Sequence, residues 1–352
     1  MKIYKVSKKI TLLSIMFVFA SSNFILAQNT QCKSVCEKLN VNLLNTEGIN
    51  FIVHNKSKKP KPTLIFIRGN GSIPLIIDET LAGAFPFKTD SISKNFNLVV
   101  VSKPGIPACA DSIQHKYINI KKGKVHFINN NDSLPNEYVS NNNLDSLTKR
   151  INTVINYLAK QKWVNHKKIF IVGHSAGAHI AAQVAKTNSY VSKFVCLSSN
   201  PYGRFQEKIR AVRVKEIYDI VSREEANILI DSIYKEYQKV YENRFDNINT
   251  YDSDTYFSWA SFTFPSLAST LLSINKPFLY VYGTGDVNRL DVDYLKLDFI
   301  QNEKQNLSIK KYPALGHNFM RTIYNEEGKA IGRNFYWNKV MRDIEDWLLE
   351  EI

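Results

Sequence analysis

Short apolar runs alternate with longer amphipathic segments along most of the chain. The runs are rich in β-branched and aromatic residues, which favour strands, and they cover Ile49 to Val53, Thr63 to Arg68, Leu98 to Lys103, Lys168 to Val172, Lys193 to Ser198, Pro277 to Tyr282 and Leu307 to Tyr312. Apolar residues at helical spacing mark Leu144 to Lys160 and Trp337 to Ile352 as helices. This alternation predicts an α/β fold with a mostly parallel sheet and crossover helices.

Two segments interrupt the alternation. From Asn200 to Ser258 the strands lapse, and a Tyr-rich helical stretch runs from Ile217 through Tyr241. We interpret residues 200–258 as a helical insertion in a single domain. The Asn-rich segment Asn129 to Asn143 is expected to be an exposed loop.

The first 27 residues have the pattern of a secretory signal peptide. Met1 to Lys9 carries four lysines and no acid, Ile10 to Ala20 is almost wholly apolar, and Ala27 offers a small residue for cleavage. Polar residues at 21–23 break the apolar run before it reaches the length of a membrane span, which favours cleavage over a signal anchor. We therefore expect an exported protein, periplasmic or secreted, with residues 28–352 as its single domain and no membrane contact beyond the export signal.

The composition is that of an ordinary globular protein, with 44% hydrophobic and 12% aromatic residues. It excludes wholesale disorder, collagen and a multi-disulfide scaffold. The net charge is +14, but basic residues are scattered among polar and acidic ones, so we expect no nucleic-acid partner. Within the insertion, one group of basic residues either attracts an anionic substrate or forms a solvated helix face: Arg204, Lys208, Arg210 and Arg213.

Four cysteines allow three pairings in an exported protein. Cys32 and Cys36 are close enough in sequence to close a small loop, whereas Cys196 lies in an apolar run typical of a buried strand. The pairing of these three and Cys109 stays open, as does the oligomeric state.

The segment Gly173-His174-Ser175-Ala176-Gly177 stands directly between an apolar strand and a helical run. A serine at such a turn adopts strained backbone angles, and the flanking glycines let strand and helix approach closely. The spacing G-x-S-x-G in this context is typical of a nucleophile elbow. His174 and His179 flank the elbow, and metal binding there would compete with the turn, so we interpret both as structural.

A serine hydroxyl needs a histidine to take its proton and an acid to orient that histidine. The strand ending at Tyr282 leads into Asp286, and the strand ending at Tyr312 leads into His317, which is the only histidine after Asp286. Because parallel strands end at one edge of a sheet, Ser175, Asp286 and His317 are expected to meet there. Asp291 and Asp293 are rival acids, which we interpret as helix N-terminal residues.

Acyl transfer also requires backbone donors for the developing oxyanion. One should be the amide of Ala176, directly after the serine. The second should come from the glycine-rich turn after the strand Thr63 to Arg68, with Asn70 the first candidate and Gly71 the second.

With these motifs in this order, the chain resembles the α/β-hydrolase superfamily from about Thr63 to its last helix. The Tyr256-Phe257-Ser258-Trp259 stretch is similar to dienelactone-hydrolase-like and prolyl-oligopeptidase-like proteins. The resemblance implies a mostly parallel eight-stranded sheet with a helical cap, a covalent acyl-enzyme and no metal or organic cofactor. One departure is Arg68-Gly69, where many members carry His-Gly; this puts the oxyanion geometry in doubt.

We therefore predict a serine hydrolase that cleaves an ester or related acyl bond of a small molecule. Aromatic residues in or near the insertion either line its substrate pocket or pack the cap onto the core: Tyr202, Phe205, Tyr256 and Trp259. Two alternatives stay open, a peptidase acting on short peptides with the same triad and a non-catalytic binding protein of this fold. Motifs for zinc proteases, zinc modules and phosphate loops are absent from the sequence.

Overall fold

A computed structural model describes residues 32–110, 118–121, 124–127, 134–252, 254–286 and 289–351. The predicted signal peptide and its cleavage site lie outside these residues. Among the described helices, none combines the length and the apolar character that crossing a bilayer requires.

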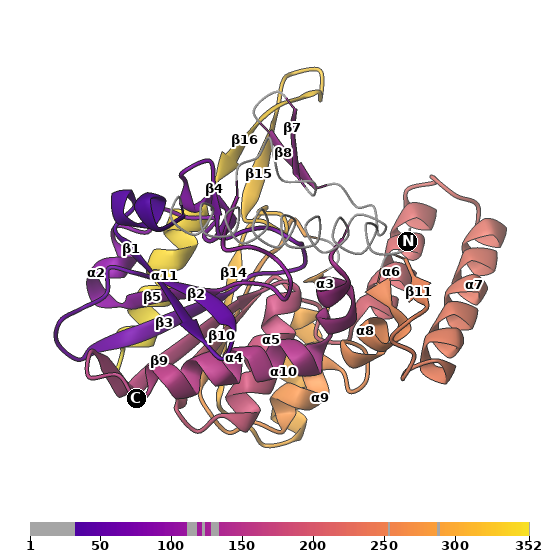
Figure 1. The fold of residues 1–352 in the computed structure, drawn as a ribbon. Helices are drawn as coiled ribbons and strands as arrows, with labels where there is room; N and C mark the ends of the chain where they lie inside the picture. The colour runs from indigo at the N-terminus through magenta and orange to yellow at the C-terminus, as the bar shows by residue number, and fades with distance from the viewer. Residues whose placement is uncertain are drawn as a thin grey trace, which may run out of the picture.

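The centre of the molecule is an eight-stranded sheet (Figure 1). Its strands, in spatial order, are β1 (Val41–Thr46), β2 (Ile49–His54), β5 (Asn97–Val101), β3 (Lys61–Ile67), β9 (Val164–His174), β10 (Val191–Leu197), β13 (Phe278–Gly283) and β14 (Leu307–Tyr312). The β1–β2 and β2–β5 pairs are antiparallel, and all the other pairs are parallel. This confirms the predicted mostly parallel eight-stranded sheet; all seven predicted strands form, and β1 is an addition.

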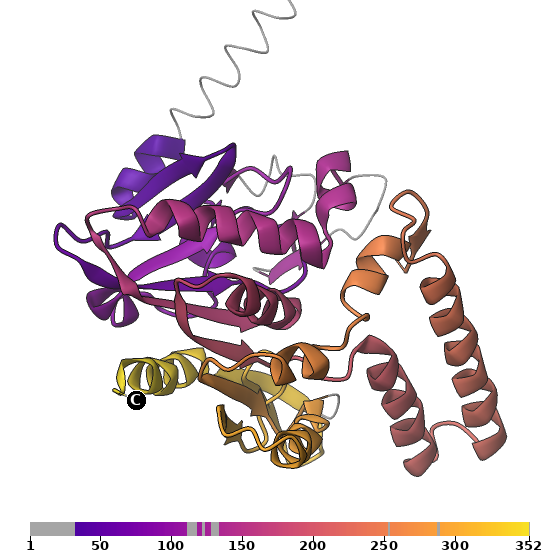
Figure 2. The same ribbon diagram turned by 90° about the horizontal axis from the view of Figure 1, so that it is seen from below.

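Helices cover both faces of the sheet, and each face has its own apolar core (Figure 2). One core includes residues of α4 (Leu144–Leu158), α5 (Ala176–Thr187), α9 (Leu267–Leu272) and α10 (Val292–Gln301). The other includes residues of α2 (Ile92–Asn95), α11 (Trp337–Leu349) and a short helix at residues 32–38. Both long helices predicted from apolar spacing are present, although α11 ends at Leu349.

The remaining short elements lie in the connections. They are β4 (Ile76–Ile77), η1 (Leu81–Gly83), β6 (Cys109–Ala110), β7 (Ile118–Lys121), β8 (Lys124–Phe127), α3 (Asn136–Asn141), β15 (Met320–Tyr324) and β16 (Ala330–Phe335). The hairpin β15–β16 follows His317 in sequence and stands out from the body of the molecule (Figure 1).

The prediction of an exposed loop at 129–143 is wrong for its second half, whereas residues 129–133 lie outside the part of the chain that the structure describes. Residues 136–141 form α3, and Tyr138, Asn142 and Asn143 are buried. The asparagines are used for hydrogen bonding: the Asn143 side chain accepts from Ser146 N at 2.9 Å to cap α4, and Asn142 donates to Asp254 at 3.0 Å. An Asn-rich composition therefore marked helix boundaries here rather than a solvated loop.

Between β10 and β13 the chain forms α6 (Arg204–Ile217), α7 (Arg223–Glu242), β11 (Thr250–Tyr251), β12 (Asp254–Thr255) and α8 (Tyr256–Ser261). Figure 2 shows α6 and α7 as a helical hairpin standing away from the sheet. This insertion has its own apolar core, which includes Phe205, Ile230 and Trp259. A separate core of this kind makes the insertion a distinct packing unit within the chain.

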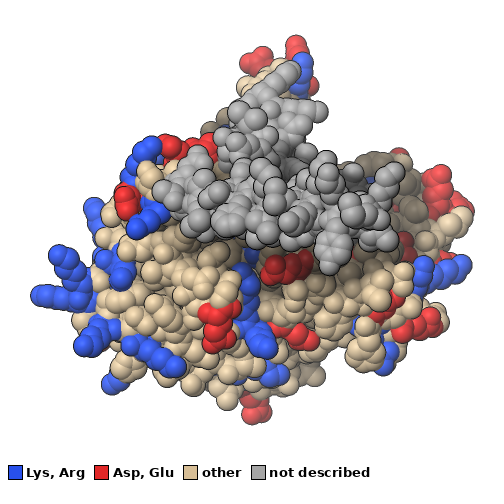
Figure 3. All heavy atoms as spheres, viewed as in Figure 1, with Lys and Arg blue, Asp and Glu red and all other residues tan. Residues whose placement is uncertain are grey.

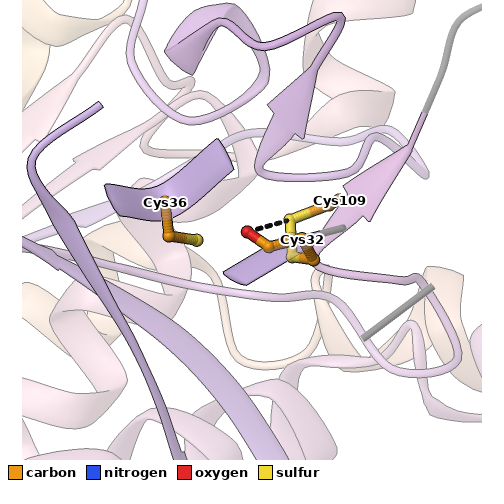
Figure 4. Close-up of side chains that lie close together, drawn as sticks. All are labelled: Cys32, Cys36 and Cys109. Carbon is orange, nitrogen blue, oxygen red and sulfur yellow. Dashed lines mark hydrogen bonds between the residues drawn. A yellow bond between two sulfur atoms is a disulfide. The ribbon is translucent and has the colours of Figure 1, made fainter. Parts of the chain in front are cut away.

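A disulfide joins Cys32 to Cys109, with a Cα–Cα distance of 5.7 Å, and ties the helix at 32–38 to β6. Cys36 is a buried free thiol whose side chain lies beside this disulfide (Figure 4). Burial, with a contribution from Glu37, raises the pKa of Cys36. Cys196 is also free and buried, as its strand pattern predicted.

Charged side chains of both signs are interspersed on the face shown in Figure 3. Several are paired in surface salt bridges, such as Lys38 with Glu79 at 3.0 Å. On this face, basic side chains are therefore accompanied by acidic ones.

Candidate active site

Ser175 lies at a sharp turn between β9 and α5. Its φ of 56° and ψ of −123° are strained for a residue with a side chain, and its backbone N–H donates to Leu197 O at 2.8 Å. Glycine is required on both sides: a Cβ on Gly173 would lie 2.1 Å from Gly177 O, and one on Gly177 would lie 2.3 Å from Ile67 O. The backbones of the strand and the helix are therefore close enough to require glycine at both positions, as expected for the G-x-S-x-G spacing.

The loops that follow β13 and β14 pack backbone against backbone. A Cβ on Gly283 would lie 2.1 Å from Leu315 O, and Gly285 N donates to that same carbonyl at 2.9 Å. These contacts fix Asp286, on the first loop, beside His317, on the second.

Three side chains from these turns form a continuous chain of hydrogen bonds. The His317 Nε2 atom lies 3.2 Å from Ser175 Oγ, and its Nδ1 atom lies 3.0 Å from Asp286 Oδ2. Asp286 is 8% exposed. Its buried carboxylate fixes the tautomer in which Nδ1 carries the proton, which leaves Nε2 free to accept a proton from the serine.

The rival acids are engaged elsewhere. Asp291 forms a salt bridge with Arg210 and accepts from Asn200 at 3.2 Å. Asp293 accepts from Tyr282 at 2.8 Å and from Lys311 at 2.5 Å. Each is at the start of α10, as expected, although neither side chain caps the helix in the way an N-cap residue does.

His174 supports the backbone of His317. Its Nε2–H donates to the His317 carbonyl oxygen at 3.2 Å, and its ring packs 5.0 Å from that of Trp337. Burial, followed by the neighbouring His317, lowers the pKa of His174 to about 3. His174 is therefore a neutral hydrogen-bond donor at neutral pH.

The turn after β3 contacts the serine directly. A Cβ on Gly69 would lie 2.9 Å from Ser175 Cβ, and the next residue, Asn70, lines the cavities on both sides of the serine. Ala176 lines one of these cavities, whereas Gly71 lines neither. Of the predicted oxyanion donors, Asn70 and Ala176 thus border the space where an oxyanion would form.

Arg68 directly precedes this turn and organises it. Its guanidinium donates to the carbonyls of Ile73 at 3.0 Å, Pro74 at 3.4 Å and Gly83. Burial lowers the pKa of Arg68 to about 10, so it remains charged at neutral pH. Arg68 is therefore a cation that hydrogen-bonds the loop from 73 to 83.

Two cavities meet at Ser175. The first, of about 380 Å³, lies beside α6 and α8 and is lined by His179, Arg204, Lys208, Trp259, Phe262 and Arg289, among others. The second, of about 360 Å³, is lined by Phe66, Phe85, Pro86, His174, His317 and Trp337, among others.

Of the four aromatic residues predicted to contact substrate, only Trp259 lines these cavities. Phe205 and Tyr256 are buried in the core of the insertion. Tyr202 packs against the sheet core and donates to Asp298 at 2.6 Å. These three follow the packing alternative that the sequence left open.

Several lining residues were not predicted, including His179, Phe262 and Arg289. His179 packs edge-on against Phe262 at 5.7 Å, and burial, followed by Arg204 and Arg289, lowers the pKa of His179 to about 3. The sequence could have indicated this role of His179, because it lies four residues after Ser175 and residues i and i+4 share a helix face.

Among the described residues, one cluster of potential metal ligands has its atoms within 4.8 Å of one another, namely Cys32, Cys36 and Cys109. Two of its sulfurs are joined in the disulfide, which leaves a single thiol. This cluster therefore offers too few ligands for a metal site.

No protein-family model matches the sequence, and no curated protein matches it. Solved structures are similar to this chain. A candidate esterase from Staphylococcus aureus superposes with a TM-score of 0.52 at 13% identity, covering 90% of this chain and 85% of its own. Dipeptidyl peptidase 4 from Porphyromonas gingivalis has a TM-score of 0.49 at 10% identity. The match covers 89% of this chain but 35% of the peptidase, so this chain spans about a third of that protein's length. A candidate dienelactone hydrolase from Klebsiella pneumoniae also has a TM-score of 0.49, at 13% identity, covering 88% of this chain and 98% of its own.

At these identities the likeness concerns the fold. The order of the eight strands, the turn after β9 and the loops that carry Asp286 and His317 agree with it. This chain has the α/β-hydrolase fold.

Proposed function

We propose that this protein is a serine hydrolase that cleaves carboxylic esters through an acyl-enzyme intermediate. The observation that carries the proposal is the hydrogen-bonded chain from Ser175 through His317 to Asp286, with the serine at a strained turn. Strain is retained where the surrounding structure enforces it, and such positions cluster at active sites. The fold supports the same reaction class, because its catalytic loops meet at this edge of the sheet.

In the proposed reaction, His317 Nε2 takes the proton of Ser175 Oγ as the oxygen attacks the acyl carbon. Asp286 stabilises the imidazolium that forms. The backbone N–H groups of Ala176 and Asn70 hold the oxyanion, and the imidazolium then gives its proton to the leaving alcohol. Water, activated by the same histidine, hydrolyses the acyl-enzyme.

The first test is labelling of the mature protein with a fluorophosphonate probe, which reacts with activated serines. We expect labelling of the wild type and its loss in Ser175→Ala and His317→Ala, because the hydroxyl is unreactive without its base. Ser198→Ala is the matched control, since its buried hydroxyl lies on the neighbouring turn. A folded wild type that is not labelled would contradict the proposal and favour a binding protein of this fold.

Ester and peptide hydrolysis use the same triad and differ in the leaving group. Rates on 4-nitrophenyl esters and on aminoacyl 4-nitroanilides therefore separate the proposal from the peptidase alternative. We expect the esters to be hydrolysed faster by at least about tenfold. Faster hydrolysis of the anilides would replace the proposed esterase with a peptidase.

We also propose that the protein is exported and cleaved near Ala27. The disulfide between Cys32 and Cys109 supports this, because disulfides persist mainly in oxidising compartments. N-terminal sequencing of protein recovered outside the cytoplasm tests it; a mature terminus at Met1 would contradict cleavage.

A further inference from the structure

The two cavities beside Ser175 are lined by largely different residues, and this difference bears on the substrate of the proposed hydrolase. Of the residues that the structure describes, only Ser175 and Asn70 line both of them. His317 lines the second cavity but not the first. A substrate attacked by the serine would therefore extend one part into each cavity.

The position of His317 indicates which portion of the substrate occupies each cavity. The histidine must protonate the leaving oxygen, so the alcohol portion has to lie on its side, in the second cavity. The acyl portion then points away from His317 into the first cavity, which Ala176 also borders. This step rests on the proposed function.

Cationic side chains line the first cavity. Arg204 pairs with Asp254 at 3.3 Å and Lys208 pairs with Glu236 at 3.1 Å, and neither acid lines the cavity. Each ion pair is thus oriented with its positive end toward the cavity. A third cation, Arg289, also lines the cavity, but its charge is balanced by Glu207. The Glu207 carboxylate lines the same cavity and lies 2.7 Å from the Arg289 guanidinium.

One aromatic ring holds both cations in place. The Arg204 guanidinium carbon lies 4.6 Å from the Trp259 ring centroid, and Lys208 Nζ lies 5.1 Å from it. Such cation–π contacts reduce the freedom of long side chains while leaving N–H donors for a ligand. Burial is the main reason that the pKa of His179 is lowered, and the additional lowering by Arg204 and Arg289 is consistent with a positive potential here.

We propose that the acyl group of the substrate carries a carboxylate, which Arg204 and Lys208 bind in the first cavity. A pair of fixed cations is the arrangement that recognises a carboxylate through charge-assisted hydrogen bonds. The second cavity has three aromatic side chains in its lining, Phe66, Phe85 and Trp337, which suit an aromatic or aliphatic alcohol. Arg68 also lines this cavity, but its guanidinium donates to backbone carbonyls of the loop from 73 to 83. The substrate class is therefore a monoester of a short dicarboxylic acid.

The test compares mono-4-nitrophenyl adipate with 4-nitrophenyl hexanoate, which share the leaving group and the acyl length and differ in the terminal charge. We expect kcat/KM to favour the adipate ester by at least about tenfold, after subtraction of the uncatalysed rate. In Arg204→Met and Lys208→Met the adipate-to-hexanoate ratio should fall by about tenfold. Arg213→Met is the matched control, because Arg213 lies on the same helix, α6, and pairs with Glu216 at 2.7 Å. A wild type that hydrolyses hexanoate as fast as adipate would overturn the inference and leave the proposed esterase intact.

A binding measurement keeps the inference testable without turnover. Calorimetry on Ser175→Ala with monomethyl adipate should give a Kd that weakens by about tenfold when Arg204→Met or Lys208→Met is added. Retention of the thermal unfolding temperature in each variant shows that the insertion is folded. Undetectable binding, or a Kd that neither substitution changes, would refute the carboxylate site even if no ester is hydrolysed.

Discussion

Replacing Asp286 by asparagine is the most informative change at the proposed triad. The carboxylate lies 3.0 Å from His317 Nδ1 and is buried. At that distance and an effective dielectric constant of about 20, it stabilises a unit positive charge on the imidazole by about 5.5 kcal/mol. Because about 1.4 kcal/mol corresponds to a tenfold change in rate, Asp286→Asn should lower kcat/KM for a 4-nitrophenyl ester by about 10⁴-fold. The asparagine would also favour the wrong imidazole tautomer.

Asp293→Asn is the matched control, since Asp293 begins the neighbouring helix and contacts Tyr282 and Lys311 instead of the histidine. Its kcat/KM should stay within about twofold of wild type, as is usual for surface ion pairs. Thermal unfolding of both variants, followed by circular dichroism, shows whether a lost rate reflects lost structure. If folded Asp286→Asn keeps more than about a tenth of the activity, the role assigned to Asp286 is wrong.

Three further predictions concern the scaffold. Gly177→Ala should abolish fluorophosphonate labelling and lower the free energy of unfolding by more than about 3 kcal/mol. The reason is that the added Cβ would lie 2.3 Å from a carbonyl oxygen of β3. Unchanged labelling of this variant would contradict the tight turn. Burial lowers the pKa of His174 and of His179 to about 3, so each is neutral when folded but protonates in the unfolded chain below its ordinary pKa of 6.5. The free energy of unfolding should therefore fall as pH drops from about 6.5 toward 4, by up to about 1.4 kcal/mol per pH unit for each histidine, and urea titrations of His179→Gln should show a shallower slope. Cys32→Ser should lower that free energy by about 4 kcal/mol, since the disulfide to Cys109 spans a separation of 77 residues; an equal urea midpoint with and without reductant would refute this.

The turns that carry Ser175, Asp286 and His317 were predictable because they depend on local sequence. Gly173 and Gly177 fix the turn around Ser175 by excluding side chains, and a strand followed by a short loop places Asp286 and His317 at one edge of the sheet. The edge strand β1 was missed because its polar alternation is weak in sequence and its pairing with β2 is set by a hairpin.

Side-chain direction within the insertion was not predictable from composition. Phe205 and Trp259 are both aromatic and in mutual contact at 5.5 Å, yet only Trp259 reaches the cavity beside the serine. Which one does so depends on how α6 and α8 pack against each other, and that packing is a property of the whole insertion rather than of either segment.

The geometry around Ser175 and the charge of the first cavity depend on different parts of the chain. The geometry of Ser175 and its partners is fixed by glycine contacts between backbones of the sheet, where a Cβ would meet carbonyl oxygens at 2.1 to 2.3 Å. Two cations of the first cavity, Arg204 and Lys208, are instead carried by α6, whose Phe205 packs into a core that is distinct from those of the sheet. Arg289 links the two regions, because it lies 2.7 Å from Glu207 of α6 and 3.8 Å from Asp286. Arg204 and Lys208 pair instead with Asp254 and Glu236, so substitutions at these two positions are expected to alter what the serine accepts more than how it is activated. That difference is why the ratio of two esters, rather than the rate on either one, is the measurement that isolates the cavity.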